Sequence, residues 1–210
     1  YTTLFRSEPF FVRPYPIRED QKPVIEREMQ RLEKLGIIKK GLTGFSSPVL
    51  LVKRKQQNLY RVVTDFRVLN EQLVRINHAF PLVRDCLDAI GNSDCDILSV
   101  LDLRDAYHTL RLAKESQKYC GITPYYGSPT YYYLRMGMGI SASPGLWMQF
   151  VHILWQELPQ KERYKIIMDD ILIFSQMTTH LQDLEDLFEV LIKFGLKISP
   201  HKCQLFMKKL

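Results

Sequence analysis

Two adjacent carboxylates interrupt an apolar run near the C-terminal end of this chain. Residues 166–174 read IIMDDILIF, and Asp169 and Asp170 are the charged residues among them. An ionised carboxylate without a partner is costly in apolar surroundings. The run therefore predicts two short buried strands joined by a tight turn, with both carboxylates at one edge of a sheet.

A third carboxylate, Asp102, ends the apolar stretch 97–103, which also predicts a buried strand. If the two elements are neighbours, each charge raises the pKa of the others, and a divalent cation would resolve the repulsion. Mg²⁺ prefers oxygen ligands, and two ions roughly 3.5–4 Å apart can serve phosphoryl or nucleotidyl transfer. The alternative is that Asp169-Asp170 marks a plain hairpin turn and that Asp102 is an unrelated strand end.

The rest of the chain mixes helices and strands in no regular order, which favours an α+β architecture. Periodicity predicts helices over about 18–35, 84–90 and 179–194, the last with a Thr179–Gln182 capping box, and a helix that starts at Ser143-Pro144 with Ser143 as N-cap. Strand-like runs at 49–53 and 59–68 predict a hairpin with a basic tip, and 118–133 predicts short irregular strands.

The composition of the chain is compatible with several kinds of function and does not identify one. The 210 residues carry a formal charge of +6, which permits a polyanion such as nucleic acid as partner. The four cysteines have no C-x-x-C spacing, so neither zinc nor a disulfide framework is indicated, and an intracellular location is expected. No apolar run approaches the ~20 residues of a membrane span. The chain reads as a fragment of something longer.

Seven collinear motifs resemble those of the reverse transcriptases of retroviruses and gypsy-type LTR retrotransposons. They are GIIKKGLTGFSSPVLLVKRK (36–55), YRVVTDFRVLN (60–70), FPLVRD (80–85), LDLRDAYH (101–108), GMGISASP (137–144), MDDILIFS (168–175) and GLKISPHKC (195–203). Together they cover nearly the whole chain. The resemblance implies a right-hand polymerase with fingers in 1–80, palm in 81–118 and 144–210, and a fingers/palm insertion in 119–143. The chain would end before the primer grip and thumb.

The resemblance also implies a role for individual residues. Asp102, Asp169 and Asp170 match the catalytic ligands of two Mg²⁺ ions, which Mn²⁺ can replace, and the carbonyl of Leu103 would complete one site. The nucleotide-binding positions are Arg54, Arg61, Asp105, Ala106, Tyr107 and Met138, with Tyr107 as a steric gate against the 2′-hydroxyl. Template or primer positions are Arg67, Asn70, Gly139 and Met168, and Asp65 with Arg67 would brace the fingers. Lys202 matches a lysine that would protonate the leaving pyrophosphate.

Two departures from the family pattern affect substrate contacts rather than metal binding. The usual tyrosine before x-D-D is Ile167 here, and the usual proline of the nucleotide-side loop is Gly137. The expected function is RNA-directed DNA synthesis from a primer and dNTPs on an RNA or DNA template. Linked thumb, RNase H and integrase regions are expected in the parent polyprotein, in a cytoplasmic particle or the nucleus. The alternative is a decayed or co-opted fragment that binds nucleic acid or a protein.

Overall fold

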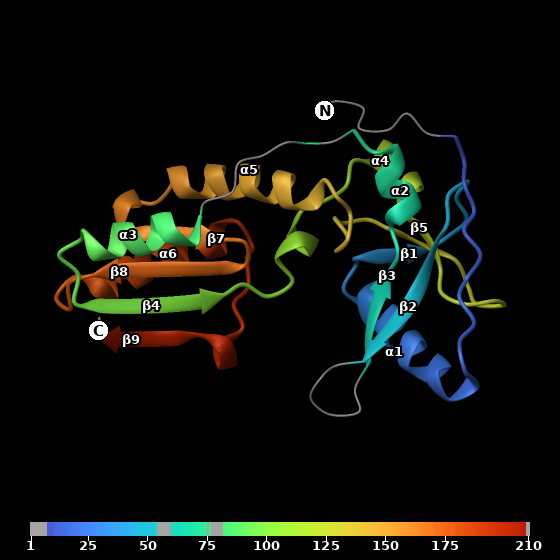
Figure 1. Ribbon diagram of the computed structural model, residues 1–210, viewed down its shortest axis with the longest axis horizontal. Coiled ribbons are helices and arrows are strands. Elements are labelled where there is room, and N and C mark those ends of the chain that lie inside the picture. Colours follow the sequence, from blue (N-terminus) through green and yellow to red (C-terminus); the bar gives the residue numbers. More distant parts are fainter. Residues whose placement is uncertain (1–7, 54–59, 75, 77–81, 209–210) are drawn as a thin grey trace. The chain divides into compact units, whose positions relative to one another are not determined.

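The computed structural model describes residues 8–53, 60–74, 76 and 82–208. The chain forms two compact units, one from residues 1–76 and 110–143 and the other from residues 77–109 and 144–210. Each unit is therefore built from two separate segments and contains its own β-sheet (Figure 1). The fold is the mixed α+β class that was predicted.

The first unit contains a five-stranded sheet in the order β1-β6-β5-β2-β3. Its strands are β1 (Ile38–Lys40), β2 (Ser47–Lys53), β3 (Tyr60–Thr64), β5 (Gly121–Thr123) and β6 (Tyr131–Tyr133), and its helices are α1 (Lys22–Lys34), α2 (Arg67–Gln72) and α4 (Lys114–Gln117). Helix α1 buries Ile25, Met29 and Leu32, whose spacing puts them on one stripe. The first described part of the chain, including a bridge from Phe11 to Ser46, joins this unit.

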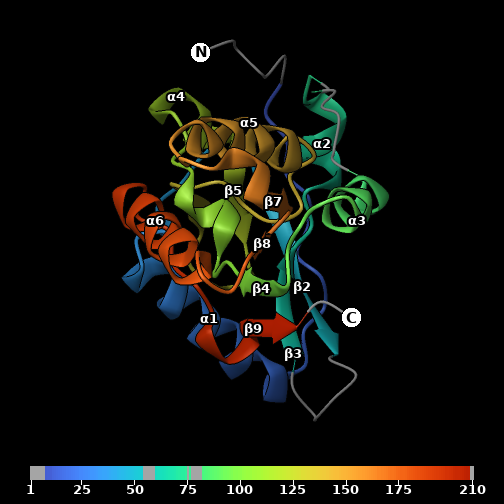
Figure 2. The same cartoon turned by 90° about the vertical axis from the view of Figure 1, so that its left-hand side faces the viewer.

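The second unit contains a four-stranded antiparallel sheet in the order β7-β8-β4-β9. Its strands are β4 (Ile97–Asp102), β7 (Tyr164–Ile167), β8 (Asp170–Ser175) and β9 (Gln204–Lys208), and its helices are α3 (Val83–Gly91), α5 (Ser143–Gln156) and α6 (His180–Lys193). Buried and half-buried residues alternate along β4, so one face of the sheet is covered more deeply than the other. Figure 2 shows α6 on one side of this sheet and α3 on the other.

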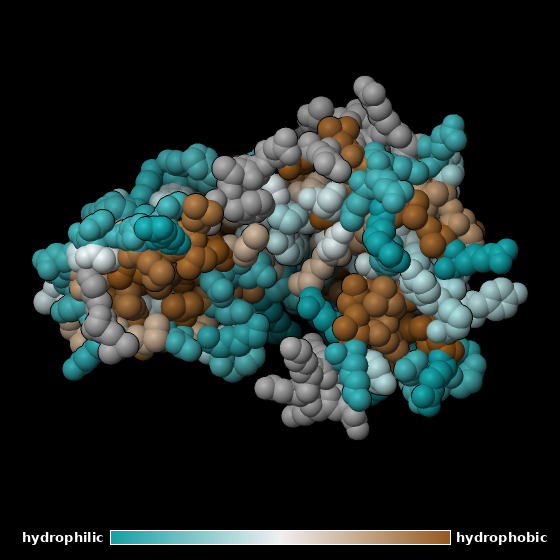
Figure 3. Space-filling model, viewed as in Figure 1, coloured by the Kyte–Doolittle hydropathy of each residue, from teal (hydrophilic) through white to brown (hydrophobic). Residues whose placement is uncertain are grey.

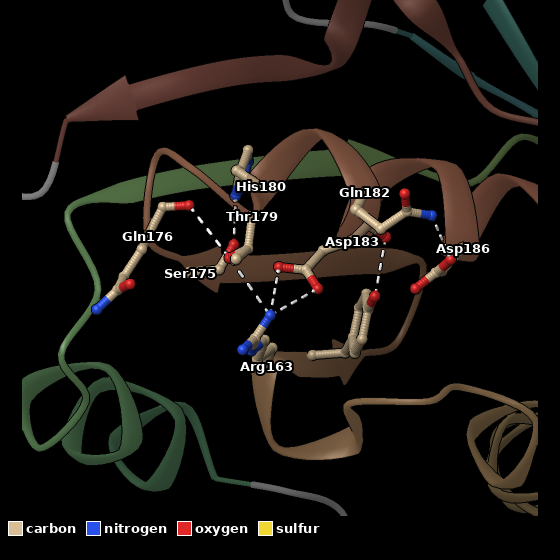
Figure 4. Close-up of polar contacts among 9 residues, drawn as sticks. Arg163, Ser175, Gln176, Thr179, His180, Gln182, Asp183 and Asp186 are labelled. Atoms are coloured by element: carbon tan, nitrogen blue, oxygen red, sulfur yellow. Dashed lines mark hydrogen bonds and ion pairs between the residues drawn. The ribbon is translucent and has the colours of Figure 1, made fainter.

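A polar cluster fixes α6 to the covered face of this sheet (Figure 4). The imidazole of His180, fully buried, lies within hydrogen-bond distance of the hydroxyls of Ser99 on β4 and Ser175 on β8, at 2.7 Å each. Arg163 donates to both carboxylate oxygens of the buried Asp183 at 3.0 and 3.2 Å. Because every one of these buried polar groups has a partner, the cluster specifies how α6 sits on β4 and β8.

Three local expectations are wrong. The strand predicted to reach residue 68 ends at Thr64, and Arg67 begins α2. The capping box of α6 does not form, because Thr179 donates to the carbonyl of Gln176 and Gln182 donates to Asp186. Ser143 is the first residue of α5 and donates its hydroxyl hydrogen to the carbonyl of Gly137 rather than capping the helix.

Apolar side chains are also exposed on the second unit. Figure 3 shows hydrophobic surface in the region of α3, where Leu82, Val83 and Leu87 are between 60% and 64% exposed. No helix within the described ranges is both long enough and apolar enough to span a membrane.

Candidate active site

The turn between β7 and β8 carries two of the predicted site residues in a strained backbone. Strand β7 ends at Ile167 and β8 begins at Asp170, so Met168 and Asp169 form the loop. Met168 has a φ of +55°, a left-handed conformation that side-chain-bearing residues rarely adopt. Such strain costs of order 1–3 kcal/mol and persists only where surrounding contacts impose it.

Trp147 supplies one of those contacts. Its indole is fully buried, and Nε1 donates to the carbonyl oxygen of Met168 at 2.7 Å. Met168 as a whole residue remains 40% exposed, so its backbone carbonyl is held while the residue is accessible to a ligand. This role of Trp147 could not be predicted from the sequence, because the apolar spacing of α5 indicates only that Trp147 faces a core.

Asp102 lies directly across the sheet from Asp170, with the register Asp102↔Asp170 between β4 and β8. The N–H of Leu103 donates to the carbonyl oxygen of Asp169 at 2.7 Å beside this pair. That bond makes Asp102 and Asp170 a non-hydrogen-bonded pair, in which Cα atoms are about 4.5 Å apart. Strand pairing therefore brings the three predicted aspartates together within the second unit.

The three aspartate side chains have different surroundings. Burial, and then the charges of Asp102 and Asp170, raise the pKa of the Asp169 carboxyl above its usual range. Its Oδ1 is buried and has no hydrogen-bond partner among the described residues. A buried carboxylate oxygen without a donor is the kind of atom that a cation would satisfy.

Asp102 has a different partner. Lys202 Nζ donates to both of its carboxylate oxygens, at 3.1 and 2.9 Å. This hydrogen bond lowers the pKa of Asp102, against the opposing effect of burial. Among the described residues, no group of three or more His, Cys, Asp or Glu side chains is arranged so that it could hold a metal ion. Carboxylate oxygens are the kind of ligand that Mg²⁺ accepts, and Asp169 Oδ1 lacks a partner. The three side chains are nevertheless not arranged around an ion in this structure, in which the Asp102 carboxylate is bound to an ammonium group.

The segment that follows β4 places the predicted nucleotide-pocket residues of this unit. Ala106 is buried, and Asp105 has a φ of +51°. Tyr107 packs edge-on against Trp147 with ring centroids 6.1 Å apart. Burial, and to a lesser extent the charge of Asp169, raise the pKa of Tyr107. Tyr107 and the Met168–Asp169 turn therefore share one support, the Trp147 side chain.

The remaining predicted residues belong to the first unit. Arg61 on β3 donates from Nη2 to the sulfur of Met138 at 2.9 Å. Asn70 on α2 uses both ends of its amide: Nδ2 donates to the carbonyl of Gly139, and Oδ1 accepts from the N–H of Ser141, each at 2.8 Å. Gly139 has a φ of +90°. Asn70 thus holds the 137–141 loop in shape. Arg54 lies outside the described residues.

Arg67 is fixed by an ion pair. Its Nε and Nη2 reach the carboxylate of Asp65, with Nη2 to Oδ2 at 2.7 Å, and Nη2 also donates to the hydroxyl of Tyr15. The hydrogen bonds from Arg67, ahead of that from Tyr15, hold the pKa of Asp65 well below its usual range. Tyr15 also donates to Asp65 at 2.7 Å, a hydrogen bond that the sequence does not indicate.

Residues 52–210 match the family model described as reverse transcriptase (RNA-dependent DNA polymerase). The chain is similar to the retrovirus-related Pol polyproteins from transposon 297 and transposon gypsy of Drosophila melanogaster, with 28% identity over 97% and 25% over 95% of this chain. It is also 30% identical, over 92% of its length, to the transposon Tf2-3 polyprotein of Schizosaccharomyces pombe. The chain covers 19%, 19% and 14% of these three relatives.

The fold has solved counterparts. A structure of the foamy viral protease-reverse transcriptase in complex with dsDNA superposes with a TM-score of 0.83 at 24% identity, covering 98% of this chain and 42% of that one. The complex of the same kind of protein with RNA/DNA hybrid gives a TM-score of 0.82 at 24% identity, covering 96% and 26%. These likenesses show the fold.

Proposed function

The chain belongs to the reverse transcriptase (RNA-dependent DNA polymerase) family, and from that premise we propose that it adds deoxynucleotides to a primer 3′-hydroxyl by two-metal nucleotidyl transfer. The observation that supports this most strongly is the pairing of Asp102 with Asp170 beside Asp169, whose buried Oδ1 lacks a partner. The two units correspond in this proposal to fingers and palm.

Asp102, Asp169, Asp170 and the carbonyl of Leu103 would hold two Mg²⁺ ions, for which Mn²⁺ is a substitute. The chemistry supplied by the ions when bound is activation of the attacking hydroxyl and stabilisation of the leaving oxygen. The strained Met168 turn and the indole of Trp147 keep Asp169 in place before substrate arrives, so little reorganisation is needed at the moment of reaction.

Tyr107 would exclude ribonucleotides. A ring beneath C2′ leaves no room for a 2′-hydroxyl, and the contact with Trp147 limits how far that ring can move. Asp105 and Ala106 would lie against the incoming nucleotide beside it. Arg61 and Arg54 would neutralise the triphosphate, with Met138 against the sugar.

Lys202 would give a proton to the leaving pyrophosphate, since an ammonium group beside the carboxylates is a suitable acid. Arg67, Asn70, Gly139 and Met168 would contact template or primer. For Asn70 the proposal is indirect, because its amide is engaged in supporting the loop that carries Gly139.

The partners follow from the same proposal. They are a primer on an RNA or DNA template and dNTPs, handled inside the cell. Because the relatives are polyproteins of which this chain covers a fifth or less, we propose that thumb, RNase H and integrase regions are linked to it in its parent protein.

Single-nucleotide primer extension with the chain in molar excess over primer tests the proposal. We expect incorporation of a dNTP that requires Mg²⁺ or Mn²⁺ and that Asp169→Asn lowers by on the order of 10²-fold or more, the scale of losing a transition-state electrostatic contact. Asp186→Asn, which changes a half-buried carboxylate on α6, is the matched control and should retain activity. Incorporation that survives Asp169→Asn would refute the mechanism.

A further inference from the structure

The ammonium group of Lys202 forms an ion pair with the carboxylate of Asp102, which is proposed to bind metal. Nζ bonds to both oxygens of Asp102 at 2.9 and 3.1 Å, and the Asp102 side chain is only 20% exposed. A carboxylate whose two oxygens accept from an ammonium group has weakened capacity to coordinate a cation, since both partners compete for the same lone pairs.

The backbone holds the segment that carries Lys202 against the end of β4. The N–H of Ser199 donates to the carbonyl of Asp102 at 2.8 Å, and the N–H of Arg104 donates to the carbonyl of Lys197 at 2.7 Å. Lys202 then ends a 3-10 turn, Pro200–Lys202, that starts directly after this anchor. The backbone hydrogen bonds therefore hold Lys202 close enough to Asp102 for the two side chains to pair.

The Lys202 side chain is 57% exposed, so it can leave Asp102 for solvent without disturbing the core. A mobile cation on a fixed backbone is suited to neutralise a carboxylate temporarily. The neighbouring Asp169, with a buried oxygen that lacks a partner, receives no such bond from Lys202 in the structure.

We propose that Lys202 is a built-in counter-ion that competes with the divalent cation for Asp102, so that metal binding requires Lys202 to release this carboxylate. The inference rests on the proposed function, since it takes Asp102 as a metal ligand. In this proposal Lys202 sets the metal affinity of the chain before substrate binds. This role is additional to the proposed proton transfer from Lys202 to pyrophosphate.

Mn²⁺ binding to the 210-residue chain, followed by electron paramagnetic resonance of free Mn²⁺ and by calorimetry, tests the proposal without using activity. Lys202→Met removes the charge and keeps a long side chain. We expect it to bind Mn²⁺ about three- to tenfold more tightly, because an ion pair of this exposure contributes modestly. Lys202→Arg should stay near wild type. Lys197→Met removes an equal charge from the same segment and should leave the affinity unchanged.

Asp169→Asn separates this inference from the proposed function. If wild type binds Mn²⁺, Asp169→Asn abolishes that binding and Lys202→Met binds no more tightly than wild type, the counter-ion proposal is wrong while the metal site stands. If Mn²⁺ binding is absent from all variants, or is unaffected by Asp169→Asn, both are overturned.

A second measurement needs no variant. Saturating Mn²⁺ should increase the rate at which an amine-reactive reagent modifies Lys202, relative to Lys197, because the ammonium group leaves its carboxylate. An unchanged ratio of the two labelling rates in a chain that has bound Mn²⁺ would contradict the proposal.

Discussion

A substitution at Trp147 tests whether this residue only fills the core or also holds the β7–β8 turn in shape. Replacing it with phenylalanine keeps an aromatic ring against Tyr107 and removes the indole N–H that holds the Met168 carbonyl at 2.7 Å. The loss of that hydrogen bond leaves a carbonyl without its partner, and the smaller ring leaves a cavity at a fully buried position. Together these effects should lower the free energy of unfolding by about 2–4 kcal/mol.

The matched control is Trp155→Phe on the same helix. The indole of Trp155 also donates to a backbone carbonyl, that of Lys161 at 3.1 Å, but Trp155 is only half-buried and its acceptor lies away from the β7–β8 turn. Its replacement should cost about 1 kcal/mol. Urea unfolding of both variants, followed by circular dichroism, measures the difference.

The site readout is Mn²⁺ affinity. Without the Trp147 hydrogen bond the left-handed Met168 is free to relax, and Asp169 moves with it. A loss of roughly 1 kcal/mol of preorganisation weakens Mn²⁺ binding about fivefold. Trp155→Phe should bind Mn²⁺ like wild type. Equal affinities of Trp147→Phe, Trp155→Phe and wild type would refute the role of the indole in holding the turn.

Three further predictions concern packing, sugar selection and pH. Gly121→Ala should destabilise the first unit by more than about 2 kcal/mol in thermal unfolding, because an added Cβ would clash with the backbone carbonyl oxygen of Phe45. The control Gly44→Ala meets only ordinary contacts and should stay within about 0.5 kcal/mol of wild type. Tyr107→Val should raise the incorporation of rNTPs relative to dNTPs in single-nucleotide extension, and an unchanged ratio would count against the steric gate. Burial lowers the pKa of His180 below its usual 6.5, despite the opposing charges of two aspartates. The unfolded chain therefore takes up a proton first as pH falls, so the contribution of His180 to the free energy of unfolding, fully retained above pH 6.5, should decrease progressively below that pH, with a shallower decrease in His180→Asn.

The carboxylate turn could be predicted because its signal is local. A short apolar run, a two-residue interruption and a second run leave little alternative to a hairpin, and the structure has β7 and β8 on either side of the Met168–Asp169 loop. The sequence predicted the pairing of this hairpin with β4 only as a condition, because that pairing depends on contacts between residues 68 to 78 positions apart, from Asp102↔Asp170 to Ile97↔Ser175.

The wrong prediction of a strand over residues 65–68 has an identifiable cause. The alternation of charged and apolar residues continues past Thr64, so the pattern extends the strand, but the side chain of Asp65 accepts from the N–H of Arg67 and turns the backbone into α2. A side chain that bonds to nearby backbone competes with strand pairing, and the alternating pattern does not register it.

The contacts that tune the site carry no sequence signal. Lys202 reaches Asp102 across 100 residues, and Trp147 reaches Met168 across 21. The local pattern indicates only a core position for Trp147, and it is the family resemblance that gives Lys202 a role at the site, without indicating its contact with Asp102. Only the paired strands and the anchored 197–199 segment bring them to the carboxylates.

Anomalous X-ray scattering from crystals of the chain grown with Mn²⁺ would test the central claim most directly. We expect manganese bound by carboxylate oxygens of Asp102 and Asp169, with Lys202 displaced from Asp102. Manganese bound only at other residues, with the Lys202–Asp102 pair intact and Asp169 unligated, would contradict it.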